Sequence, residues 1–131
     1  MIKIFSKHKV IFYLLNFFLI FLYLYPGSFL GWIIYNNKKI QPQITSDFII
    51  SSNHFYVFVL ISIIGFFSFP KSNQSKYLIF YLIFIANILE IFHLTIPERS
   101  FQWSDLFGNL IGVFIVIFIK ILISNYGSCK K

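Results

Sequence analysis

Residues 77–96 of the chain read YLIFYLIFIANILEIFHLTI, an apolar run that contains Asn87, Glu90 and His93. A helix of about 20 predominantly apolar residues crosses a hydrocarbon core about 30 Å thick. The run therefore predicts a transmembrane helix. A carboxylate inside a membrane is costly unless it is paired, hydrated or protonated, so we expect Glu90 to face a bundle interior or a water-filled cavity.

Three further apolar runs, at about residues 10–25, 48–69 and 106–123, have suitable lengths. Proline ends helices, and Pro26, Pro70 and Pro97 each follow an apolar run directly. A shorter patch at 30–35 contains Trp32 and is predicted to be re-entrant or interfacial. The sequence thus predicts an all-α membrane protein with four transmembrane helices, at about 10–25, 48–69, 77–96 and 106–123, in a single domain spanning 1–131.

The composition agrees with lipid as the main solvent, since 58% of the 131 residues are hydrophobic and only 11% are charged. The net charge of +7 does not indicate nucleic-acid binding, because the cations lie between apolar runs and not along one face. With the N-terminus inside, eight cations are cytoplasmic and three are outside, which predicts cytoplasmic N- and C-termini. The cytoplasmic set is Lys3, Lys7, Lys9, Lys71, Lys76, Lys120, Lys130 and Lys131, and the outer set is Lys38, Lys39 and Arg99.

This topology gathers polar residues at the outer ends of the last three predicted helices. If the site is catalytic, His54 or His93 would be the general acid or base and Glu90 its partner, since histidine titrates near neutral pH. We expect Arg99 to hold a phosphate or carboxylate through paired hydrogen bonds. The candidate catalytic residues are His54, Glu90, His93 and Asp105, and the candidate ligand-binding residues are Arg99, Trp103 and Asn109.

Gly108 and Gly112 form a GxxxG pair on the face of the last predicted helix that also carries Asp105 and Asn109. Small residues at this spacing let two helices approach closely. Because a short connection joins the helices at 77–96 and 106–123, we expect this face to pack against the helix at 77–96. The two polar residues would then be turned away from lipid.

The run from Glu90 to Gly112 resembles the VanZ-like family of small bacterial membrane proteins. That family has a Glu, a polar residue three positions later, an Arg six beyond it, and then Asp, Asn and Gly at spacings of six, four and three. A His and two aromatic residues at the start of its second helix are matched by His54, Phe55 and Phe58, and the resemblance covers about 48–118. The matching residues of the run are Glu90, His93, Arg99, Asp105, Asn109 and Gly112.

The resemblance implies a multi-pass bacterial inner-membrane protein that binds or processes a cell-envelope lipid or lipid-linked ligand. The family takes its name from a member linked to resistance to glycopeptide antibiotics, so an antibiotic ligand is a second implication. This chain departs from the family pattern at His93, where Gln is usual, and at Ile50 and Ser51, where an Asp-Lys pair is usual.

Three other interpretations stay open. A structural interpretation pairs Arg99 with Glu90 or Asp105 to fasten two helices together. A metal interpretation uses Glu90 and His93 with His54 and Asp105, because Glu-x-x-His can direct two ligands at one centre. A transporter or oligomeric pore is the third, although the predicted helices contain no paired broken segments. We expect membrane lipids and a second copy of the chain as partners, no nucleic acid and no cofactor, and a single cysteine, Cys129, excludes a disulfide within the chain.

Overall fold

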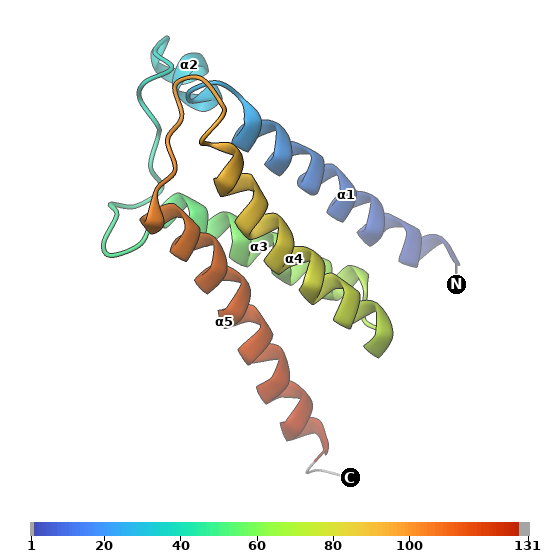
Figure 1. Ribbon diagram of the computed structural model, residues 1–131. Coiled ribbons are helices and arrows are strands. Elements are labelled where there is room, and N and C mark those ends of the chain that lie inside the picture. The colour runs from blue at the N-terminus through green and yellow to red at the C-terminus, as the bar shows by residue number, and fades with distance from the viewer. Residues whose placement is uncertain (1, 129–131) are drawn as a thin grey trace.

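The computed structural model describes residues 2–128 and the side chains of residues 7–126. Every regular element in this part of the chain is a helix (Figure 1). The predicted roles of Cys129, Lys130 and Lys131 lie outside the described residues. The helices are α1 (Ile2–Leu24), α2 (Phe29–Tyr35), α3 (Ser52–Ser68), α4 (Ser72–Phe92) and α5 (Trp103–Ser128).

Three of these helices contain segments long and apolar enough to cross a membrane, namely Lys7–Leu24, Ser72–Phe92 and Trp103–Tyr126. The fourth long helix, α3, is also apolar but has only 17 residues. Its predicted start at Phe48 is wrong, since Phe48 is 92% exposed and the helix begins at Ser52. Asp47 explains this start, because its Oδ1 accepts a hydrogen bond of 2.8 Å from the Ser52 backbone N–H.

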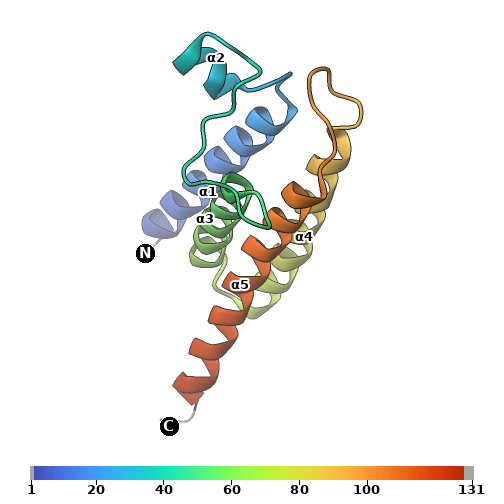
Figure 2. The same ribbon diagram turned by 90° about the vertical axis from the view of Figure 1, so that its left-hand side faces the viewer.

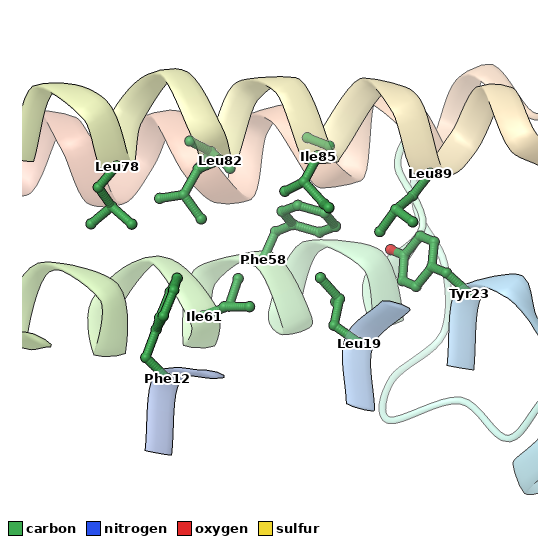
Figure 3. Packing of buried hydrophobic residues seen from close by; sticks show 11 residues of the cluster. Phe12, Leu19, Tyr23, Phe58, Ile61, Leu78, Leu82, Ile85 and Leu89 are labelled. Atoms are coloured by element: carbon green, nitrogen blue, oxygen red, sulfur yellow. The ribbon is translucent and has the colours of Figure 1, made fainter. Parts of the chain in front are cut away.

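The four long helices alternate in direction and pack side by side (Figures 1 and 2). Helix α3 contacts α1, α4 and α5, so it holds the bundle together. Phe58 and Ile61 of α3 meet leucine and isoleucine side chains of α4 and the side chains of α1 (Figure 3). The segment after α4 returns to the end of the bundle where α3 and α5 begin, so the predicted site residues come from one end (Figure 1).

The apolar patch predicted at 30–35 forms α2, which lies at this same end of the bundle (Figure 1). Ser28 caps it, because its hydroxyl accepts a hydrogen bond from the Gly31 N–H at 2.9 Å. The helix ends at Asn36, which adopts the left-handed conformation. Trp32 and Ile33 are exposed, which agrees with an apolar surrounding, and the re-entrant or interfacial placement of α2 stays a prediction.

The prediction that the GxxxG face of α5 packs on α4 is wrong, because that face packs on α3. A Cβ on Gly108 would lie 2.8 Å from the Ser51 carbonyl oxygen, and one on Gly112 would lie 2.7 Å from the Phe55 carbonyl oxygen. A helical repeat defines a face but does not say which neighbour it meets. The short connection to α4 therefore did not decide the closest partner.

This close approach predicts that Gly112→Ala destabilises the bundle. The new methyl group would meet a backbone oxygen that cannot rotate away, and overpacking costs about 1–3 kcal/mol. Gly65→Ala is the matched control, since a Cβ there would meet only the ends of the Leu78 and Phe12 side chains, at 3.0 Å and beyond. Both changes gain the same helix propensity, so the difference between them reports the packing. We expect Gly112→Ala to have a lower melting temperature and to unfold at a lower SDS concentration than Gly65→Ala. Equal stability of the two variants would contradict the packing.

Candidate functional site

The Tyr23 hydroxyl lies at the centre of the site. It donates a hydrogen bond of 2.7 Å to the Asn109 Oδ1 and lies 2.9 Å from the His54 Nδ1. The His54 Nδ1 is also 3.1 Å from the same Asn109 oxygen. All three side chains are buried, so α1, α3 and α5 meet through a closed polar contact.

Asn109 extends this contact to α4. Its Nδ2 donates a hydrogen bond of 3.1 Å to the Ala86 carbonyl oxygen, which fixes the amide so that the Oδ1 faces Tyr23 and His54. On the other side of the imidazole ring, the His54 Nε2 lies 3.4 Å from the Asp105 Oδ2. Both nitrogens of His54 therefore face oxygen atoms of α5.

Glu90 and His93 form a second buried pair. The Glu90 Oε1 accepts a hydrogen bond of 2.9 Å from the Gln102 backbone N–H. The Glu90 Oε2 lies 3.1 Å from the His93 Nδ1, at an angle that makes no hydrogen bond, and it has no other partner among the described residues. The His93 Nε2 is 3.1 Å from the Tyr23 carbonyl oxygen, and the two rings stack at a centroid distance of 5.6 Å.

Arg99 binds the end of α1. Its Nη2 donates to the Leu22 carbonyl oxygen at 3.0 Å and its Nε donates to the Tyr25 carbonyl oxygen at 3.3 Å. Leu22 belongs to the last turn of α1 and Tyr25 follows it directly, and carbonyl groups at a helix end lack intrahelical partners. The predicted alternative in which Arg99 pairs with Glu90 or Asp105 is therefore wrong, and within residues 7–126 no carboxylate lies in ion-pair distance of its guanidinium. Burial lowers the Arg99 pKa from its ordinary value, while neighbouring acidic groups act in the opposite direction.

A cavity of about 240 Å³ opens beside these groups. His54, His93 and Arg99 contribute its charged or titratable wall, and Leu22 and Phe29 belong to its apolar wall. A second cavity, of about 400 Å³, lies between α1 and α4 farther along the bundle and is lined by none of the predicted site residues. The first cavity is the place where a ligand could touch the site.

The structure brings together six of the seven predicted site residues, but not Trp103. Trp103 is 66% exposed, stacks on Phe107 and does not line the cavity. Asn109, predicted to bind a ligand, is fully buried and bound by protein groups. The residues that lie together are His54, Glu90, His93, Arg99, Asp105 and Asn109.

Sequence reasoning missed Tyr23. It assigned the run at 10–25 to a span and drew no site residue from it, because a tyrosine near the end of an apolar run is typical of the membrane interface. The signal that could have identified Tyr23 is its predicted depth in the membrane. Tyr23 precedes Pro26 on the same side of the predicted membrane as His54 and Glu90.

Three of the predicted site residues lie close enough together to hold a metal ion. His54, Glu90 and Asp105 each present one ligand atom, and these atoms all lie within 4.8 Å of one another. His93, which the metal hypothesis also included, is not in this group, although it touches Glu90.

Comparisons with known proteins give no family for the chain. No protein-family model matches it, and no curated protein or solved structure is significantly similar to it. The functional conclusions below therefore rest on the residues and their geometry.

The central position of Tyr23 predicts that Tyr23→Phe destabilises the protein. Loss of the hydroxyl removes its hydrogen bond to the Asn109 Oδ1 and its contact with the His54 Nδ1, and a buried hydrogen bond contributes about 0.5–1.5 kcal/mol to stability. Tyr13→Phe is the control, since Tyr13 lies on the same helix and is 59% exposed. Thermal unfolding in detergent should place Tyr23→Phe clearly below both Tyr13→Phe and the wild type. Indistinguishable melting of the two variants would show that the hydroxyl contributes nothing.

Proposed function

We propose that the chain is a VanZ-like protein of the bacterial inner membrane whose cavity binds or processes the anionic headgroup of a cell-envelope lipid or lipid-linked ligand. The observation that carries this proposal is the position of Arg99. Its guanidinium lines the cavity while both of its hydrogen bonds go to neutral carbonyl oxygens. A partly buried cation with neutral partners attracts an anion, and guanidinium groups match phosphates and carboxylates in shape.

The other walls of the cavity suit a lipid. Ligand sites combine apolar walls with a few converging polar groups. Leu22, Phe29 and Leu30 supply apolar surface next to Arg99, and Asn53 supplies a hydrogen-bonding amide. A volume of about 240 Å³ accepts a headgroup but not a whole lipid, so acyl chains would leave the cavity toward the surrounding membrane.

The VanZ-like assignment has support from the way its matching positions are distributed. The residues that carry the resemblance come from α3, from α4 and the connection after it, and from α5. In the folded chain Glu90, His93, Asp105 and Asn109 belong to one connected set of contacts with His54. Effects on glycopeptide susceptibility would follow if the ligand is an envelope precursor.

The proposal includes four membrane crossings, and it depends on whether α3 is long enough to cross. Its 17 residues correspond to about 25 Å, at the lower limit for a span. The packing of α3 against α1, α4 and α5 supports a position at the same depth as the helices that are long enough to cross. The basic residues Lys7, Lys9, Lys71 and Lys76 all lie at the end opposite the site, which favours cytoplasmic termini.

A second candidate function is that of a scaffold without a ligand. The contacts of Arg99 with the end of α1 and the buried Tyr23–His54–Asn109 contact favour it, because both fasten helices. In this interpretation Arg99 is needed for folding. The two candidates differ in what a stable Arg99 variant would lose.

The lipid proposal predicts that Arg99→Gln weakens retention of an anionic lipid. Loss of a charge-assisted hydrogen bond costs about 1.5–3 kcal/mol, which lowers the affinity for the lipid about tenfold to a hundredfold. Native mass spectrometry of protein released from nanodiscs of host lipids would show the bound mass in the wild type and its loss in the variant. Lys39→Gln is the control, since it removes an exposed cation from the loop at the same end.

Thermal unfolding of the same samples separates the two candidate functions. A folded Arg99→Gln protein that has lost the lipid supports the ligand site. A folded variant with the wild-type spectrum contradicts it, and a variant that no longer folds, beside a wild type without bound lipid, supports the scaffold.

The four-span topology predicts a cytoplasmic C-terminus. A green fluorescent protein fused after Lys131 should fluoresce in a bacterial host, and alkaline phosphatase at the same place should be inactive. Phosphatase fused after Lys39 should be active, because that loop lies outside. If α3 does not cross, the C-terminus moves outside and the first two results reverse.

A further inference from the structure

The potential metal ligands of His54, Glu90 and Asp105 come from three different helices, α3, α4 and α5. Their ligand atoms lie within 4.8 Å of one another. His54 is 5% exposed, Glu90 is fully buried and the Asp105 side chain is 16% exposed, so the cluster has little contact with water. Two carboxylates beside an imidazole in such a buried place need either protons or a cation between them.

The hydrogen bonds of His54 fix which ring nitrogen carries the proton. The Asn109 amide is oriented by its bond to the Ala86 carbonyl, so its Oδ1 faces the His54 Nδ1 and can only accept. The Tyr23 hydroxyl already donates to that Oδ1. Therefore the Nδ1 is the donor, and in the neutral ring the Nε2 presents its lone pair toward Asp105. A metal-bound histidine is held in this way, with its other N–H on a fixed acceptor.

The separation of His54 and Asp105 fits two ligands of one ion better than a direct contact. The Nε2 to Oδ2 distance is 3.4 Å, whereas a charge-assisted N–H···O bond is about 2.7–2.9 Å long. Two ligands of a tetrahedral zinc ion, each about 2.0–2.2 Å from the metal, lie about 3.3–3.6 Å apart. The observed distance therefore leaves room for a cation to bridge the pair.

Glu90 supplies an independent sign that the cluster can bind a cation. Its Oε2 is buried and has no hydrogen-bond partner among the described residues. The nearest group is the His93 Nδ1, but the His93 Nε2 faces the Tyr23 carbonyl oxygen and must carry the ring proton in the neutral form. The Oε2 then meets a lone pair and not a donor, while the Oε1 is held by the Gln102 N–H.

We propose that His54, Glu90 and Asp105 bind a divalent transition-metal ion, Zn²⁺ or Mn²⁺. One imidazole nitrogen and two carboxylate oxygens suit these ions. Asn109 and the Gln102 backbone are the supporting groups that orient His54 and Glu90. Three protein ligands leave a coordination position open, as in catalytic metal sites. This site does not depend on the lipid proposal, since an ion can bind without a lipid and a lipid without an ion.

The test is the metal content of the wild-type chain in detergent after removal of any affinity tag. The protein is stripped with EDTA, incubated with Zn²⁺ or Mn²⁺ alone and separated from free ions. Its metal content is then measured by inductively coupled plasma mass spectrometry. We expect about one ion per chain and a rise in melting temperature, because the ion binds only the folded state. Asp105→Asn should lower the affinity more than about tenfold.

Asp47→Asn is the matched control, because it makes the same change in a loop carboxylate outside the cluster. It should keep both the ion and the rise in melting temperature. A wild type that holds less than about a tenth of an ion per chain and shows no thermal shift overturns the proposal. Equal ion binding by Asp105→Asn and Asp47→Asn also overturns it, since the ion would then sit elsewhere.

Discussion

A polar side chain inside an apolar bundle must find its hydrogen-bond partners within the protein, because lipid supplies none. Tyr23 meets this requirement through Asn109 and His54, and Asn109 adds a bond to the Ala86 carbonyl. One set of contacts thus fixes α1, α3, α4 and α5 relative to one another at one end of the bundle. The imidazole orientation, the cavity wall and the spacing to Asp105 all depend on it.

The helical fold follows from the sequence because long apolar runs leave few alternatives in lipid. The gathering of His54, Glu90 and Asp105 also follows, since consecutive helices alternate in direction and place these residues at one end. Helix boundaries follow less well. Hydropathy excludes the polar segment 72–76 from the predicted helix, but this segment forms the first turns of α4, because hydropathy reports what suits lipid and not where the backbone is helical.

The partners of individual side chains could not be predicted from the sequence. The faces of α5 were recognisable from the spacing of Gly108 and Gly112, but only the folded chain shows that they meet α3. Arg99 was expected to seek a carboxylate because of its charge. The open carbonyls at the end of α1 satisfy its donors instead, and no sequence pattern distinguishes these acceptors from a carboxylate. Tyr23 is a different case, because a tyrosine at the end of an apolar run is typical of the membrane interface and does not by itself indicate a buried site.

The two histidines share a geometry that links the metal site to the cavity. Each holds one ring nitrogen against an oxygen that can only accept, and each turns the other nitrogen toward a carboxylate. Two protons could satisfy these carboxylates, and so could one divalent ion that replaces the proton at the Nε2 of His54. The two states exclude each other, so ion binding would release a proton and weaken in acid. In both states the added positive charge balances the two carboxylates, so Arg99, whose hydrogen-bond partners are neutral, is the cation that favours an anionic headgroup in the cavity.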